Sequence, residues 1–356
     1  KNMPIMYLNI WDDYPTPLYN KAFYESCDLL MGISKQTVNI NKIALGNKAK
    51  DKVIKYIPHG LNHKIYRPLE TTEELDTVEK MKLDLFGKDE VDFVLFFNSR
   101  NIRRKQIPDT MWAFKMFLDS LPKEKADKCR LLMHTEKIHE AGTDLPVINE
   151  LLFEDSYPNA VVIDEKRWST AELNILYNLS DCQILLTSNE GWGLTLTEAM
   201  LAGNPIIANS TGGMQDQMRF LDEEGKWFTP SPEVPSNNTG RYKKHGEWAF
   251  PVYPTSRSIQ GSPVTPYIWD DRCKAEDAAD RIREVYDLGK EKRQEIGIKA
   301  REWCLSEEAG FTAEHQGKKF IEAADELFNT WKPREAFEVI DTDEDIRKIN
   351  THNLVY

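Results

Sequence analysis

The stretch Ser188–Gly203 (SNEGWGLTLTEAMLAG) constrains the fold of this chain more than any other segment. The apolar run Cys182–Thr187 before it is typical of a buried parallel strand, and Leu196–Leu201 is typical of the start of a helix. Between them, Gly191 and Gly193 let the backbone bend tightly and approach a ligand closely. The segment therefore predicts a strand, a turn and a helix within a parallel α/β sheet.

Two carboxylates, Glu190 and Glu198, flank this turn. The start of the helix between them offers unpaired N–H groups and the positive end of a dipole, which attract phosphate. Carboxylates accept hydrogen bonds from paired sugar hydroxyls. The arrangement predicts a site for a phosphorylated, hydroxyl-rich ligand. The competing interpretation is a glycine-rich turn with two solvated acids.

The alternation of apolar runs and helical segments extends along the whole chain. Its 356 residues allow two domains, each with its own core. Helices that cross over between apolar runs indicate parallel sheets, and hence an α/β fold. The expected strands are Ile5–Ile10, Cys27–Ile33, Val53–Ile57, Phe93–Phe97, Cys129–His134, Ala160–Ile163, Cys182–Thr187 and Ile206–Ala208.

A basic loop follows the expected strand Phe93–Phe97. Arg100 and Lys105 in this loop lie beyond the carboxyl end of a parallel strand, where open α/β sheets bind ligands. Arginine offers a bidentate fork to phosphate, and lysine offers a point charge. We therefore expect both to contact a diphosphate, and we expect Arg103 and Arg104 to be surface residues. A solvated basic loop is the alternative.

These two constellations resemble the signatures of one enzyme family. Glu190 to Glu198 is similar to the E-x7-E motif of retaining glycosyltransferases with two facing Rossmann-like domains (the GT-B fold), especially glycosyltransferase family 4. Trp192 replaces the usual Phe of that motif, and Thr195 the usual Pro. The basic loop resembles the family's G-R-x4-K segment, with a serine in place of its glycine.

The resemblance implies a domain organisation. Residues 1–66 would be the C-terminal part of the first, acceptor-side domain, which lacks its opening strand–turn–helix unit in this chain. Residues 67–311 would be the second domain, which binds the donor. A Pro-rich insertion at about 219–270 would interrupt it, as a lid or a loose tip. Residues 312–356 would supply a helix that crosses back to the first domain and an acidic tail.

The resemblance also implies roles for individual residues. Glu190 would hold the transferred sugar or stabilise its cationic anomeric centre, while Arg100 and Lys105 would stabilise the departing diphosphate. Glu198 would accept hydrogen bonds from the nucleotide ribose. The other donor-binding residues would be Gly191, Gly193, Leu194, Thr195, His134, Lys166 and Gly213.

Composition excludes some classes of protein function. The formal net charge of −12 argues against a protein that coats polyanions, and no run of 18 apolar residues suggests a spanning helix. We expect a cytoplasmic, metal-independent enzyme without a cofactor that uses a nucleotide-sugar, with UDP-sugars favoured. The acceptor stays open between a lipid-linked glycan, a polysaccharide, a protein, a small molecule and a modified nucleic-acid base.

Two rival functions are considered. A catalytically silent nucleotide-sugar binder or regulatory subunit is favoured by the loop after Ile5–Ile10, which reads Trp-Asp-Asp where many family members place a histidine. Asp12 in this loop could contact sugar or acceptor. An NAD-dependent dehydrogenase is disfavoured, because no G-x-G-x-x-G follows a strand.

Overall fold

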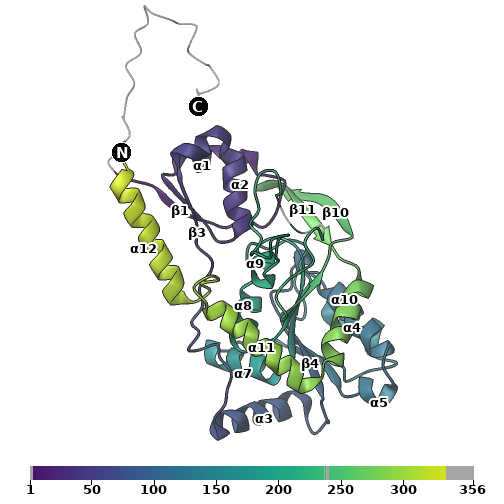
Figure 1. Cartoon of the computed structure of the whole chain (residues 1–356). Coiled ribbons are helices and arrows are strands. Elements are labelled where there is room, and N and C mark those ends of the chain that lie inside the picture. Colours follow the sequence, from purple (N-terminus) through teal and green to yellow (C-terminus); the bar gives the residue numbers. More distant parts are fainter. Residues whose placement is uncertain (1–2, 236, 238–239, 334–356) are drawn as a thin grey trace, which may run out of the picture.

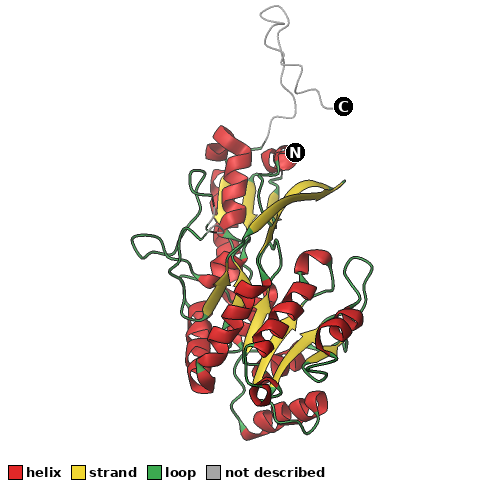
Figure 2. Cartoon of the chain, turned by 90° about the vertical axis from the view of Figure 1, so that its right-hand side faces the viewer, coloured by secondary structure: helices red, strands yellow, loops and turns green. Residues whose placement is uncertain are grey.

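The computed structural model describes residues 3–235, 237 and 240–333, so the predicted acidic tail lies outside the described residues. Figure 1 shows the elements along the chain, and Figure 2 shows helices on both faces of the strands. The larger sheet is parallel throughout, in the order β6-β5-β4-β7-β8-β9. Its strands are β4 (Phe93–Asn98), β5 (Cys129–His134), β6 (Val161–Asp164), β7 (Cys182–Leu185), β8 (Ile206–Asn209) and β9 (Ala249–Val252).

This strand order is that of a doubly wound dinucleotide-type sheet. The chain leaves β4 toward β5 on one side and returns to β7 on the other, so the topological switch point lies between β4 and β7. In open α/β sheets, ligands bind outside the carboxyl ends of the strands at this point. The fold therefore directs attention to the loops after β4 and β7.

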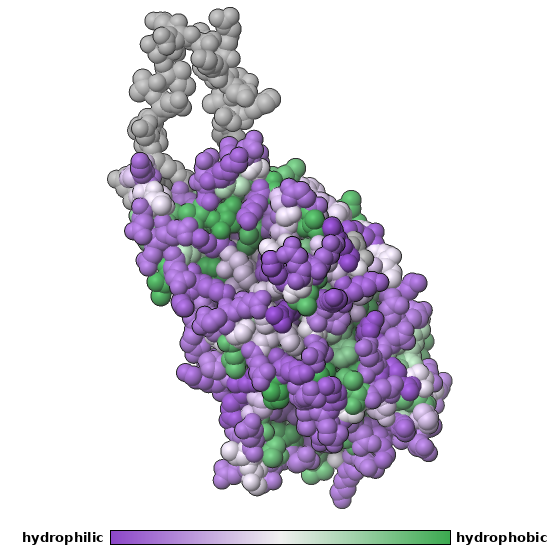
Figure 3. All heavy atoms as spheres, in the orientation of Figure 1, coloured by the Kyte–Doolittle hydropathy of each residue, from purple (hydrophilic) through white to green (hydrophobic). Residues whose placement is uncertain are grey.

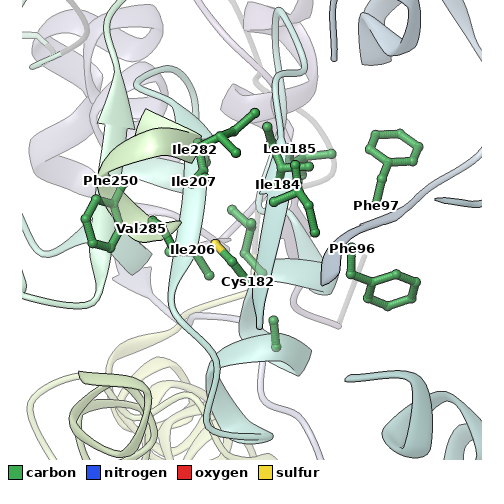
Figure 4. Close-up of a cluster of buried hydrophobic side chains, with 14 of the residues drawn as sticks. Phe96, Phe97, Cys182, Ile184, Leu185, Ile206, Ile207, Phe250, Ile282 and Val285 are labelled. Carbon is green, nitrogen blue, oxygen red and sulfur yellow. The ribbon is translucent and has the colours of Figure 1, made fainter. Parts of the chain in front are cut away.

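Burial on both faces explains the apolar strands. All six residues of β4 and all four of β7 are buried, so neither strand shows the alternation of a half-exposed sheet. Phe96, Ile184 and Ile207 belong to one buried hydrophobic cluster with Ile282 and Val285 of the helix α10 (Ala275–Asp287), and Figure 4 labels these side chains. Burial of such side chains contributes about 1.5–3 kcal/mol each to stability.

Helices cover both faces of the larger sheet. The charged run after residue 70 forms the helix α3, which begins at a capping box formed by Thr71 and Glu74 and buries only Val78 and Phe86. The helices of this region are α3 (Thr72–Phe86), α4 (Ile107–Asp119), α5 (Lys123–Ala126), α6 (Leu145–Phe153), α7 (Thr170–Leu179), α8 (Leu194–Leu201), α9 (Met214–Met218), α10 (Ala275–Asp287) and α11 (Gly289–Leu305), with a 3-10 turn η3 (Arg103–Lys105).

A smaller parallel sheet precedes the larger one, in the order β1-β2-β3. Ser34 caps its helix α2 by accepting a hydrogen bond from the Thr37 N–H. The long helix α12 lies against this sheet (Figure 1), where Ala323 and Leu327 pack on Met31 and its neighbours. The elements are β1 (Met6–Asn9), β2 (Leu29–Gly32), β3 (Val53–Tyr56), η1 (Leu18–Asn20), α1 (Lys21–Ser26), α2 (Lys35–Leu45), η2 (Gly46–Asp51) and α12 (Ala313–Thr330).

The Pro-rich stretch 219–270 contains strands that the sequence pattern does not predict. One is β9, the edge strand of the larger sheet, whose Pro251 suits an edge because proline cannot donate to a ladder. The others, β10 (Ser256–Ser262) and β11 (Thr265–Arg272), form an antiparallel hairpin. All seven residues of β10 are exposed, so the hairpin lacks the apolar alternation that marks a strand.

Hydrophilic side chains cover most of the face seen in Figure 3. Among the helices of the described residues, none combines the length and the apolarity needed to span a bilayer.

Candidate active site

The loops after β4 and β7 meet at the switch point. The Ser188 N–H and the Thr187 hydroxyl both donate hydrogen bonds to the Arg104 carbonyl oxygen, at 2.8 and 3.0 Å. These bonds hold the basic loop and the Glu190 loop together. The two motifs that the sequence analysis singled out therefore lie side by side.

Glu190 is the centre of a charged cluster. Its Oε2 accepts hydrogen bonds from Lys105 Nζ and from Arg104 Nη1, the latter at 3.0 Å. Only 13% of the Glu190 side chain and 11% of the Lys105 side chain are exposed. Burial raises the pKa of the Glu190 carboxyl, but the charges of Lys105 and Arg104 outweigh it, so the pKa is lowered overall. Glu190 is thus a buried, ionised carboxylate.

A residue of the smaller sheet completes this cluster. Asp12, in the loop after β1, lies with its carboxylate 3.9 Å from Arg104 Nη2. Burial raises the pKa of Asp12, against the opposing charge of Arg104. Arg104 therefore bridges Asp12, in the loop after β1 of the smaller sheet, and Glu190, in the loop after β7 of the larger sheet. A ligand at Glu190 would lie within reach of the Asp12 carboxylate as well.

The structure separates Arg100 from this cluster. Arg100 is exposed on the loop after β4. The pKa of Glu136 is lowered mainly by a hydrogen bond from the Asn101 N–H, and the charge of Arg100 makes a smaller contribution to that lowering. The expectation that Arg104 is a surface residue was wrong. The turn η3 directs Arg104 and Lys105 toward the Glu190 loop, whereas Arg100 precedes that turn. The spacing of the basic residues in the sequence does not show which of them the turn directs toward Glu190.

A second polar network surrounds Glu198. Its Oε2 accepts a hydrogen bond of 2.6 Å from the Tyr177 hydroxyl, which in turn accepts one from Asn98 at 3.1 Å. The Asn98 Oδ1 lies 2.9 Å from His134 Nδ1, and His134 Nε2 lies 2.9 Å from the carbonyl oxygen of Lys166. Three predicted donor-binding residues are thus joined through two that the sequence analysis missed.

Burial explains why this network needs several donors. It raises the pKa of Glu198, and hydrogen bonds from Tyr177 and Tyr66 oppose that rise. The sequence pattern does not identify Tyr66 or Tyr177 as a hydrogen-bond partner of Glu198. Aromatic residues are common in segments that pack on a core, so a tyrosine there does not by itself indicate a site. The Lys166 ammonium is not in the network but lies 3.6 Å from the centroid of the Trp168 ring.

The glycine turn before α8 is tightly packed. Gly193 caps α8 with a φ of 88°, a left-handed conformation that favours glycine, and Leu194 beyond it is 43% exposed. Thr195, the next residue of α8, is partly buried. Trp192 is buried, and its indole N–H donates a hydrogen bond of 3.1 Å to the Thr197 hydroxyl, so its ring packs within the protein.

Gly213 belongs to the same turn by contact. Its N–H donates to the Glu190 carbonyl oxygen at 2.8 Å, and a Cβ at this position would lie 1.9 Å from the Gly191 carbonyl oxygen. This close approach aligns the backbone on either side of Glu190. Gly191 and Gly213 are thus needed for the shape of the turn itself.

We expect Gly213→Ala to destabilise the protein by about 1–3 kcal/mol, since the added methyl group would push the Glu190 loop away. Thermal denaturation measures the effect. Gly317→Ala is the matched control, because no described atom lies within 4 Å of a Cβ there and alanine suits the exposed interior of α12. Equal melting temperatures for Gly213→Ala and the parent would contradict this packing.

Part of this chain is similar in sequence to known proteins. Residues 160–233 match the family model described as "Glycosyl transferases group 1", and this segment contains Glu190, Glu198 and Gly213. The alpha-monoglucosyldiacylglycerol synthase of Acholeplasma laidlawii is 29% identical over 172 residues. That match covers 48% of this chain, and the chain spans only 38% of the relative.

Solved structures extend the similarity to the whole fold. A glycosyltransferase from Rickettsia africae aligns with a TM-score of 0.59 at 18% identity, over 90% of this chain and 70% of its own. Sucrose-phosphate synthase from Thermosynechococcus elongatus aligns with a TM-score of 0.59 at 19% identity, over 88% and 62%. An Anabaena protein solved with UDP and glucose aligns with a TM-score of 0.58 at 14% identity, over 87% and 67%.

The predicted fold class is confirmed: the chain has an α/β fold with parallel sheets, and its structural neighbours are GT-B glycosyltransferases. The predicted glycosyltransferase character is confirmed at the level of the matched domain. Membership of family 4, the domain boundaries and the roles of the single residues stay predictions.

Proposed function

We propose that this chain transfers a sugar from a nucleotide-sugar to an acceptor hydroxyl, with retention of the anomeric configuration and without a metal ion. The observation that carries the proposal is the Glu190–Lys105–Arg104 cluster at the switch point. It combines two cations for a diphosphate with a carboxylate for a polyol. UDP is the favoured nucleotide, and the Anabaena neighbour solved with UDP and glucose supports that choice.

The Glu198 network and the Glu190 cluster would bind different parts of the donor. The Glu198 network would bind the nucleoside, with the ribose on Glu198 and the base near His134 and the Lys166 carbonyl. The diphosphate would lie between Lys105 and the first N–H groups of α8, with Arg100 available at the rim. This places the sugar next to Glu190.

The pairing of Glu190 with Lys105 and Arg104 has a consequence for donor binding. Lys105 and Arg104 are both engaged by Glu190, so a diphosphate must compete with this carboxylate for them. When the phosphate oxygens take over the two cations, the Glu190 carboxylate becomes available to the sugar hydroxyls. Donor binding would thereby prepare the carboxylate for its role.

The reaction balances without a further reagent. The bond between the anomeric carbon and the phosphate oxygen breaks, and its electron pair leaves with the nucleoside diphosphate. The acceptor oxygen bonds to the same face of the anomeric carbon, and its proton passes to the departing phosphate. Lys105 and Arg104 stabilise the negative charge on that phosphate, while Glu190 orients the sugar and stabilises positive charge at its anomeric centre.

A direct experiment tests this function. A thermal-shift screen of UDP-, GDP-, ADP- and dTDP-sugars identifies the donor, and NMR then follows hydrolysis and transfer, with the product anomer reporting retention. Activity that persists with EDTA supports metal independence. Absence of both hydrolysis and transfer with every donor that binds would instead support the silent binder, for which Asp12 in place of the family histidine is the favouring observation.

Glu198→Ala should weaken UDP binding about 10- to 100-fold, because it removes a charge-assisted contact worth about 1.5–3 kcal/mol. Isothermal titration calorimetry measures the change. Glu302→Ala, on the surface of α11, is the matched control and should bind UDP like the parent. Unchanged UDP affinity in Glu198→Ala would remove Glu198 from the nucleoside site.

A further inference from the structure

The β10–β11 hairpin joins the two halves of the molecule. Along β11, Tyr267 and Trp269 point to the smaller sheet: the Tyr19 ring lies 4.9 Å from the Tyr267 ring, and the Tyr14 ring lies 6.3 Å from the Trp269 ring. Asp271 continues this side, since the Thr211 hydroxyl lies 2.9 Å from its Oδ2 and 3.0 Å from Asp13 Oδ2. Tyr267, Trp269 and Asp271 thus dock the hairpin on the first domain.

The even-numbered residues of β11 face the opposite way. Ile268, Asp270 and Arg272 line a cleft of about 640 Å³ beneath the hairpin, in the size range of small-molecule sites. This separation follows from the period of two in a strand, which sends alternate side chains to opposite faces. The hairpin is therefore both a strap between the domains and the roof of a cleft.

This cleft is adjacent to the Glu190 cluster. Arg104, which lines it, contacts Glu190 at 3.0 Å, and Asn189, which also lines it, is the residue before Glu190. The hairpin is bonded to the same loop, because the Asp271 N–H donates to the Ser188 carbonyl at 2.9 Å. A molecule in the cleft would approach Glu190 from the side of Arg104, whereas the Glu198 network approaches it from α8.

The lining of the cleft indicates the chemistry of its occupant. Two of its charges pair with each other, with Arg272 Nη2 2.7 Å from Asp109 Oδ2, and the Asp270 carboxylate accepts a hydrogen bond from the Ser188 hydroxyl. Arg103 lies exposed at its edge. The rest of the lining includes amides, which donate and accept, and apolar surface: Gln106, Asn189, Gln260, Ile102, Pro108 and Ile268. Such a mixture suits neutral hydroxyl groups and the apolar faces of a sugar ring.

We propose that this cleft binds the acceptor and that the acceptor is a neutral saccharide. The inference rests on the proposed glycosyl transfer and deepens it. The hairpin then selects the acceptor, while the Glu198 network selects the donor.

The experiment compares matched hairpin variants. Ile268→Trp fills the cleft, whereas Ile259→Trp places the same ring on the neighbouring strand at a residue that is 67% exposed and does not line the cleft. Transfer to glucose, methyl α-glucoside, N-acetylglucosamine and maltose is measured together with hydrolysis of the donor. We expect the ratio of transfer to hydrolysis to fall at least tenfold in Ile268→Trp and to stay at the parent value in Ile259→Trp.

Ala141→Trp fills the cleft from the opposite wall and should reproduce the loss, which keeps the test informative if Ile268→Trp misfolds. If either variant folds and keeps the parent's ratio of transfer to hydrolysis, the assignment of the cleft is overturned. Transfer by the parent to glucose 6-phosphate or to dioleoylglycerol in phosphatidylcholine vesicles, in preference to every neutral saccharide, would overturn the acceptor class. A parent that turns over no nucleotide-sugar would instead overturn the proposed function, and the inference with it.

Discussion

Glu190→Gln should lower sugar transfer about 10²- to 10³-fold while leaving UDP bound at least as tightly as in the parent. The substitution keeps the size of the side chain but removes the negative charge that would stabilise the anomeric centre, and one such electrostatic contact is worth about 2.7–4 kcal/mol in a transition state. UDP affinity should hold or rise, because Lys105 and Arg104 are no longer neutralised by a carboxylate.

Two measurements separate these effects. NMR follows transfer, and calorimetry reports the dissociation constant for UDP. Glu150→Gln, on the exposed surface of α6, is the control for loss of a negative charge. Parent-like transfer by Glu190→Gln would exclude the proposed role, and a large loss of UDP affinity would show that Glu190 contributes mainly to the structure of the site.

Lys105→Ala should have the second large effect. It removes the cation that lies closest to Glu190 and would contact the departing phosphate, so we expect UDP affinity to fall about 10- to 100-fold, as for a charge-assisted hydrogen bond. Turnover should fall further, because negative charge grows on that phosphate in the transition state. Calorimetry and steady-state kinetics measure the two losses.

Lys80→Ala is the matched control for Lys105→Ala, since Lys80 is an exposed lysine of α3, away from both clusters and from the cleft. A comparison of Arg100→Ala with Arg104→Ala then tests which arginine acts with Lys105. The contacts in the structure favour Arg104, whereas the family motif favours Arg100. Equal affinities for UDP in Lys105→Ala and the parent would remove the diphosphate from this loop.

Buried strands could be predicted from the sequence, whereas the exposed hairpin could not. Strands such as Phe93–Asn98 and Cys182–Leu185 were predictable because a strand buried on both faces must be apolar along its whole length. The hairpin Ser256–Arg272 was not, because most of its residues are polar or aromatic and its contacts lie in two distant parts of the chain. Its pairing depends on those partners, and local pattern does not encode them.

The site shows the same division. The sequence by itself determined the turn from Glu190 to Glu198, since glycine spacing and a helix start are local properties. Tertiary structure alone decided that Arg104 rather than Arg100 contacts Glu190, that Tyr177 and Asn98 connect Glu198 to His134, and that Asp12 joins from the other sheet. Those contacts join residues far apart in the chain, and only the packing of the two sheets and the hairpin brings them within hydrogen-bonding distance.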